Sequence, residues 1–162
     1  EILSGLVGSE MCIRDRVRMV DVIAKTDSER VAVAAASVRM NEVAYGLLTQ
    51  PGRGKGEVLN TARVAAILAA KRCAELIPLC HSLPLSFVGV EFSLDDAAHR
   101  IDIQATCRTS YKTGVEMEAM TACSVAALTI YDMCKAADKG IVIEQVRLKY
   151  KAGGKSGEWR ND

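Results

Sequence analysis

The chain has 162 residues, of which 49% are hydrophobic and 25% are charged, and its formal net charge is +1. This length and composition are typical of one globular domain with an apolar core. The nearly neutral balance excludes the strongly basic surface on which simple nucleic-acid binding depends.

The cysteines and the hydropathy pattern indicate the cellular compartment in which the protein is expected. No pair of cysteines has the CxxC spacing, and a disulfide framework is not indicated. Such scattered thiols are typical of small buried side chains in a reducing compartment. No run of about 18 apolar residues without charges is present, so no transmembrane span is predicted and a cytoplasmic protein is expected. The six cysteines are Cys12, Cys73, Cys80, Cys107, Cys123 and Cys134.

Residues 1–18 differ from the rest of the chain. They are mildly apolar but have no basic stretch at their start and no clear cleavage site, so a signal peptide is not predicted. Met11 and Met19 are both possible starts of translation. We expect residues 1–18 to be an extension, a tag or an artefact, and residues 19–162 to form a single domain.

Periodicity and breaker residues predict the elements in chain order. Pro78 ends a long helix, and a short acidic turn joins two strands as a hairpin. The predicted elements are strands at 17–24 and 29–40, a helix at 42–48, a loop at 50–56, a helix at 57–77, strands at 85–94 and 99–109 with the turn at 95–98, and a strand at 141–150.

The stretch from Thr113 to Lys135 predicts one long helix rich in Ala, Met and Leu. Thr113 and Glu116 have the spacing of a capping box, although Gly114 interrupts it. From residue 29 the order is strand, helices, two strands, long helix and strand. With right-handed crossovers this order predicts an α+β, ferredoxin-like sandwich, in which long helices pack on one face of an antiparallel sheet.

Three carboxylates mark this helix. Glu116 and Glu118 lie in its first turn, where the helix dipole favours negative charge. Asp132 lies fourteen residues after Glu118, which places the two about 21 Å apart along the helix axis. Lys135 can meet Asp132 on one helix face, and a solvated surface pair is the simpler interpretation of these two residues.

Two glycine- and lysine-rich segments, residues 52–56 and 151–157, offer backbone N–H groups and cations to an anion. A flexible loop and a basic tail are the simpler alternatives, but two such segments favour a polyanionic ligand. His81 follows the helix-ending Pro78 and is suited to donate a hydrogen bond or a proton. No second Cys/His cluster lies at ligand spacing, so no metal site is predicted.

Several motifs, in order, make the chain from about Met19 to Trp159 resemble the molybdenum cofactor biosynthesis protein C family, the cyclic pyranopterin monophosphate synthases. Ser82 stands where many members have proline. The matching motifs are Lys55-Gly-Glu-Val, Thr61-Ala-Arg63, Ala70-Lys-Arg72, Leu76-Ile-Pro-Leu-Cys-His81, Lys112-Thr-Gly-Val-Glu-Met-Glu-Ala119, Ala126-Ala-Leu-Thr-Ile-Tyr-Asp-Met-Cys-Lys135 and Gly153-Gly-Lys-Ser-Gly157.

The resemblance implies an enzyme that converts 3′,8-cyclo-7,8-dihydro-GTP to cyclic pyranopterin monophosphate with loss of pyrophosphate, at the first stage of molybdenum cofactor (molybdopterin) synthesis. It implies a lyase without a redox cofactor, supplied with substrate by an upstream radical enzyme. It also implies a hexamer, a trimer of dimers, with active sites between subunits. A nucleotide with an extended triphosphate is about 15 Å long, shorter than the separation of about 21 Å along the helix, so geometry also favours a shared site.

Carried over position by position, the resemblance makes Asp132, Lys55 and Lys135 catalytic. Asp132 and Lys135 are expected to move protons, and Lys55 to share this work if burial and nearby cations lower its pKa. Glu116 and Glu118 are expected to bind the guanine-derived ring, with helix capping as the alternative. The substrate-binding set is Leu79, Cys80, His81, Glu116, Met117, Glu118, Lys151 and Lys155.

Two other functions fit the same residues. One is a non-catalytic phosphate- or nucleotide-binding scaffold, which the neutral charge and the scarce aromatic residues, 4% of the chain, disfavour as a nucleic-acid binder. The other is a structural subunit in which Asp132 and Lys135 form only a surface contact. We therefore expect a small-molecule substrate, with no nucleic-acid or membrane partner.

Overall fold

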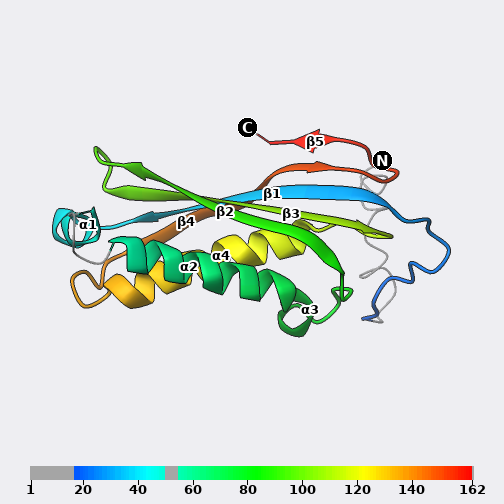
Figure 1. The fold of residues 1–162 in the computed structure, drawn as a ribbon, viewed down its shortest axis with the longest axis horizontal. Helices are drawn as coiled ribbons and strands as arrows, with labels where there is room; N and C mark the ends of the chain where they lie inside the picture. The colour runs from blue at the N-terminus through cyan, green and yellow to red at the C-terminus, as the bar shows by residue number, and fades with distance from the viewer. Residues whose placement is uncertain (1–16, 50–54, 162) are drawn as a thin grey trace.

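The computed structural model describes residues 17–49 and 55–161, which form one sheet covered by helices on a single face (Figure 1). The five strands are antiparallel and run in the order β2-β3-β1-β4-β5. The elements are β1 (Ser28–Arg39), α1 (Glu42–Thr49), α2 (Lys55–Lys71), α3 (Cys73–Leu76), β2 (Leu85–Asp95), β3 (Arg100–Tyr111), α4 (Glu116–Cys134), β4 (Val142–Ala152) and β5 (Trp159–Arg160).

The topology is that of a ferredoxin-like α+β sandwich. Without the short α1, α3 and β5, the order is β1-α2-β2-β3-α4-β4, with β1 and β3 in the middle of the sheet. Each of the two long helices connects a pair of parallel strands that have a third strand between them. The predicted fold class is confirmed.

Small side chains let the helices lie close to the sheet. Alternate residues of a strand point to one face, and in β1 the face toward the helices carries Ala32, Ala34 and Ala36, each at most 3% exposed. The facing side of α4 is also built from small residues. This explains how a chain with few aromatic residues forms a dense core. The fully buried small residues of α4 are Ala119, Ala122, Cys123, Ala126 and Ala127.

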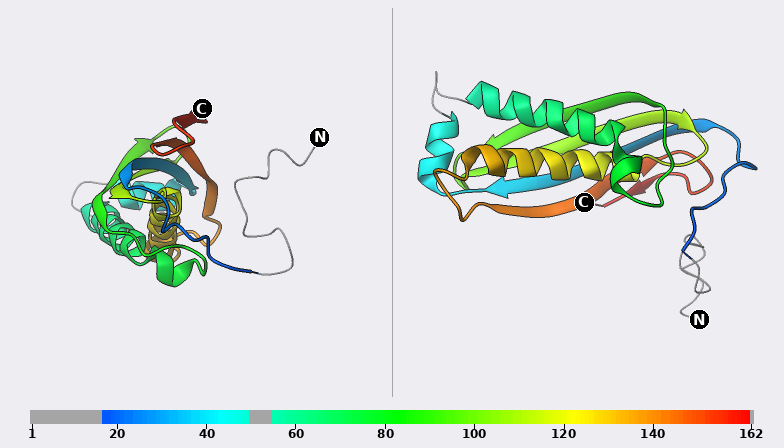
Figure 2. Two further views of the ribbon diagram at one scale, coloured as in Figure 1. Left: turned by 90° about the vertical axis from the view of Figure 1, so that its right-hand side faces the viewer. Right: turned by 90° about the horizontal axis from the view of Figure 1, so that it is seen from below.

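The two long helices run in opposite directions, so each end of the helix layer contains one start and one finish (Figures 1 and 2). At one end, Val58 near the start of α2 lines the same small cavity as Cys134 at the end of α4. At the other end, Cys73 Sγ of α3 lies 3.5 Å from Thr121 Oγ1, near the start of α4. This arrangement decides which functional residues can meet within one chain.

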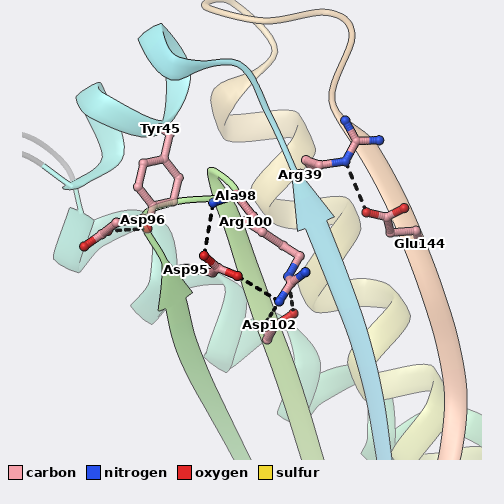
Figure 3. A network of polar contacts seen from close by, with 8 residues as sticks. All are labelled: Arg39, Tyr45, Asp95, Asp96, Ala98, Arg100, Asp102 and Glu144. Atoms are coloured by element: carbon pink, nitrogen blue, oxygen red, sulfur yellow. Dashed lines mark hydrogen bonds and ion pairs between the residues drawn. The ribbon is translucent and has the colours of Figure 1, made fainter.

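A network of polar contacts lies within the β2–β3 hairpin and links it to α1 (Figure 3). The Arg100 guanidinium lies 3.0 Å from an oxygen of Asp95 and 2.9 Å from one of Asp102. The Tyr45 hydroxyl donates to Asp96 at 2.7 Å. Burial, and then this hydrogen bond, raise the pKa of Tyr45 to about 12, so the phenol stays protonated as a donor.

Three local predictions are wrong. Residues 17–24 form no strand, because the side chains of Val17 and Ile23 stay 83% and 79% exposed and gain no burial from pairing. The helix predicted at 57–77 breaks at Arg72, where α3 turns toward α4. Val115 takes the N-cap position of α4 without a side-chain hydrogen bond, so the Thr113–Glu116 capping box does not form.

The other predicted elements are confirmed within a few residues at their ends. Of the loop predicted at 50–56, residues 50–54 lie outside the described residues, and Lys55 and Gly56 begin α2. Among the helices that the structure describes, none has both the length and the apolar character needed to cross a membrane.

Candidate active site

A pocket of about 830 Å³ with several charged side chains opens beside the start of α4, the end of this helix that lies near α3. This volume is within the range of small-molecule sites in proteins. Its walls come from the N-terminal segment, β1, the β3–α4 connection and the glycine-rich turn after β4. Five of its side chains are cationic and one is a carboxylate. The lining residues are Ala24, Lys25, Thr26, Ser28, Arg30, Lys112, Thr113, Gly114, Glu116, Lys151, Gly154, Lys155 and Ser156.

One ion pair spans this pocket. Lys151 Nζ at the end of β4 lies 2.9 Å from Glu116 Oε1 at the start of α4, and both side chains are about one third exposed (32% and 29%). A Cβ on Gly114 would lie 2.0 Å from Glu116 Oε2, so glycine is needed for this carboxylate to fold back over the helix start. Glu116 therefore pairs with a cation instead of capping the helix.

The glycine-rich turn wraps around an arginine. Arg30 Nη1 donates to the carbonyl oxygen of Gly153 at 3.1 Å, and Arg30 Nη2 donates to that of Lys112 at 3.5 Å. Gly153 and Gly154 have φ angles of 107° and 71°, which side chains disfavour. A Cβ on Gly153 would also lie 2.1 Å from the backbone oxygen of Glu29. The turn that carries Lys155 thus depends on glycine for its position.

Replacing Gly153 by alanine is expected to destabilise the protein more than the same change at Gly157. Both positions have positive φ, but a Cβ on Gly157 meets open space. Because Gly153→Ala adds a backbone clash to the shared strain, we expect it to cost about 1–3 kcal/mol more in free energy of unfolding. Urea unfolding of both variants measures the difference, and equal costs would contradict the packing described for this turn.

His81 is held by the segment that precedes β1. We call residues 17–27 the strap. His81 Nε2 lies 2.7 Å from the backbone oxygen of Val20, and Lys112 Nζ donates to the backbone oxygen of Ile23 at 3.0 Å. The strap therefore crosses from the Leu79–His81 segment to the pocket.

Burial is the main cause that raises the pKa of Cys80 to about 12, with charges on Cys73, Glu118 and Glu116 adding to it.

Glu118 is a buried acid. Its side chain is 3% exposed, and burial raises its pKa to about 7, with repulsion from Glu116 adding to the effect. A carboxyl group that titrates near neutral pH is suited to exchange protons or to donate a hydrogen bond in its neutral form. The neighbouring Met117, also predicted to contact substrate, is 37% exposed.

We expect Glu118→Gln to stabilise the protein at alkaline but not at acidic pH. An acid whose pKa rises on folding lowers stability as pH increases from its ordinary value, 4.5, through its folded value, about 7. The interval corresponds to about 3 kcal/mol, which the neutral amide recovers only when the wild-type acid would be charged. Urea unfolding at about pH 4 and pH 8.5 tests this. The exposed Glu75→Gln is the control, and a pH-independent gain at Glu118 would contradict the buried charge.

The predicted catalytic residues lie at the opposite end of α4. Asp132 and Lys135 form a direct ion pair, with side chains 71% and 55% exposed in the single chain. Hydrogen bonding to Asp132 raises the pKa of Lys135 and so favours its protonated, cationic form. Lys55 is the first residue of α2, which begins at this same end, but its side chain lies outside the described residues.

Within one chain, the predicted site residues therefore form two groups. The first, which we call the pocket group, lies around the start of α4 and includes Glu116, Lys151 and Lys155. The second, the Asp132 group, consists of Asp132 and Lys135 with the start of α2. Asp132 is sixteen residues after Glu116 in α4, which is about 24 Å by helix geometry. Sequence reasoning missed three cations of the pocket, Lys25, Arg30 and Lys112. Lys112 is the first residue of a matching motif, which was the signal that could have identified it, whereas Arg30 reaches the pocket only through its long-range contact with Gly153.

Among the described residues, no three His, Cys, Asp or Glu side chains converge as a metal site requires.

Residues 19–154 match the MoaC family. Over 147 residues, 91% of both chains, the sequence is 83% identical to the cyclic pyranopterin monophosphate synthase of Bordetella pertussis. It is 56% identical to the protein of that name from Roseiflexus sp., over 91% of this chain and 93% of the relative. It is 53% identical to the cyclic pyranopterin monophosphate synthase of Chloroflexus aggregans, over 91% of this chain and 89% of the relative.

Proposed function

Because the chain belongs to the MoaC family, we propose that it is a cyclic pyranopterin monophosphate synthase. It converts 3′,8-cyclo-7,8-dihydro-GTP to cyclic pyranopterin monophosphate and pyrophosphate in molybdenum cofactor biosynthesis. The observation that carries this proposal is the identity of 83% with a synthase over 91% of the chain. The domain responsible is residues 19–162, and we infer that it works without a redox cofactor.

The pocket group is suited to the triphosphate. Lys25, Arg30, Lys112, Lys151 and Lys155 supply cations around one opening. Positive groups fixed before the reaction stabilise the charge that develops on a leaving pyrophosphate. We infer that Lys151 exchanges its contact with Glu116 for a phosphate oxygen, which frees Glu116 to accept hydrogen bonds from the substrate's ring. We infer that Glu118 binds the same ring, that Leu79, Cys80 and Met117 contact the substrate, and that His81 acts with Lys151 and Lys155 on the triphosphate.

The Asp132 group is suited to proton transfer. When the cyclic phosphate closes, a hydroxyl oxygen of the substrate bonds to the α-phosphorus, the bond from this phosphorus to its bridging oxygen breaks, and pyrophosphate leaves. The hydroxyl proton must pass to a base. We infer that Asp132 accepts protons, that Lys135 donates them, and that Lys55 assists. Positioned acids and bases of this kind contribute about 10²–10⁴-fold to a rate.

The two groups are separated along α4, so we propose that each site combines the pocket group of one subunit with the Asp132 group of another. The assembly is a hexamer, a trimer of dimers. Two surfaces that no element of residues 17–49 and 55–161 covers are available for contacts between subunits. One is the sheet face opposite the helices (Figure 2), and the other is the outer side of the helix layer. Val64, Leu68 and Leu128 of that layer are 57%, 48% and 57% exposed in the single chain.

We also infer functional coupling to the upstream radical enzyme that makes the cyclic dihydro-GTP, and a cytoplasmic location. Free thiols at five described cysteines support a reducing compartment. They are Cys73, Cys80, Cys107, Cys123 and Cys134.

Incubation with purified 3′,8-cyclo-7,8-dihydro-GTP tests the function. We expect stoichiometric pyrophosphate and a pterin that becomes fluorescent after oxidation. A scaffold would instead bind the nucleotide and release neither product. Tight binding to DNA or RNA that falls steeply with salt would favour a nucleic-acid scaffold.

A further inference from the structure

The strap makes an unusual set of contacts. Its apolar side chains Val17, Met19 and Ile23 are 83%, 51% and 79% exposed, so burial of these groups does not hold it in the single chain. Two of its backbone carbonyls instead accept hydrogen bonds from side chains of the candidate site, Val20 from His81 and Ile23 from Lys112.

The strap also has a defined local shape. Asp21 Oδ1 accepts a hydrogen bond from the Ile23 N–H at 2.9 Å, and the Lys25 N–H donates to the Val22 oxygen at 3.0 Å. These two bonds close a turn between the carbonyl that meets His81 and the residues that line the pocket. The match to the family begins at residue 19, so this turn belongs to the matching part of the chain.

The contact with Val20 fixes the chemistry of the imidazole. A backbone carbonyl oxygen has no proton, so the nitrogen 2.7 Å from it must be the donor. His81 Nε2 therefore carries hydrogen. In the neutral ring, the second nitrogen, Nδ1, then holds the free lone pair.

We propose that the strap is a positioning element, in which the Val20 carbonyl selects the Nε2–H tautomer of His81 and leaves Nδ1 to accept a proton or a hydrogen bond from the substrate. The Ile23 carbonyl holds Lys112 at the rim of the pocket in the same way. The part of this proposal that concerns substrate rests on the proposed function. The assignment of the His81 tautomer does not rest on the proposed function.

The chain is well suited to a direct test, because it contains only two histidines, His81 and His99. Long-range ¹H–¹⁵N NMR of the full-length protein, recorded at about pH 8.5, reports the tautomer of each ring. We expect the Nε2–H form for His81 in the wild type. His99 lies in the connection from β2 to β3, whereas His81 precedes the other end of β2, so His99 serves as the internal reference.

Two variants change the strap. Deletion of Val20 shifts the carbonyls by one residue, and Asp21→Ala removes the bond that shapes the turn while keeping every backbone carbonyl. Asp27→Ala, an exposed strap residue with the same change in charge, is the control. We expect both strap variants to give a mixture of His81 tautomers, an unchanged His99, and kcat lower by about 10- to 100-fold, as for a misplaced catalytic group.

An Nδ1–H tautomer in the wild type would overturn the proposal. So would lower kcat in both strap variants with the His81 tautomer unchanged, because that pattern indicates a structural role only. If the deletion variant does not fold, Asp21→Ala decides between the same outcomes. Failure of the wild type to turn over the cyclic dihydro-GTP would instead refute the proposed function, while the NMR result still decides the tautomer.

Discussion

Asp132→Asn is expected to lower turnover by about 10²–10⁴-fold, the contribution of a positioned acid or base. Asparagine keeps the shape of the side chain but cannot accept a proton at neutral pH. Since Asp132 is 71% exposed in the single chain, its replacement should leave the free energy of unfolding nearly unchanged. Single-turnover release of pyrophosphate measures the rate, and urea unfolding measures stability.

The exposed pair formed by Arg160 and Glu158 provides the matched control, because Glu158→Gln removes a carboxylate from a comparable surface ion pair. We expect it to keep wild-type turnover. Full activity in Asp132→Asn would mean that Asp132 and Lys135 form a surface contact without a catalytic role. A large loss of stability in the same variant would attribute the lost rate to misfolding.

Mixing Asp132→Ala chains with Lys155→Ala chains is expected to restore activity that neither variant has alone. If a site takes Asp132 from one subunit and Lys155 from another, random exchange in an equal mixture gives about one quarter of sites with both intact halves. The measurement is pyrophosphate release after the chains have been mixed, exchanged and reassembled.

The control is the double variant, Asp132→Ala with Lys155→Ala, mixed equally with wild type. Without exchange, half of the chains remain in wild-type assemblies. With exchange, the intact fraction of shared sites falls to about one quarter, so activity must decrease. Recovery in the first mixture and loss in the second together identify a shared site. If exchange is demonstrated and neither change occurs, each chain builds its own site.

The regular part of the fold was predictable because local signals and global packing agree. The alternation in β1 and β3 and the Ala-rich pattern of α4 each encode burial against the same sheet. The predictions failed where local patterns compete with distant partners. Thr113 and Glu116 have the spacing of a helix capping box, yet the Glu116 carboxylate instead accepts a hydrogen bond from Lys151, which is 35 residues away in the sequence.

The candidate site was less predictable than the fold. The family resemblance identified Glu116, Lys151 and Lys155, and the structure brings these three to one pocket. No local pattern indicated Arg30, because its role comes from β1 lying beside β4 and from the turn at Gly153. The residues 17–24 look like a strand, and only the contacts with His81 and Lys112 reveal a different use.

The opposite ends of α4 carry the two halves of the proposed site, and this has a consequence for assembly. A ligand that contacts both halves binds only to associated subunits, so its binding energy also strengthens their association. Nucleotide should therefore slow the exchange of chains between oligomers. Dilution should inactivate the empty enzyme sooner than the loaded one.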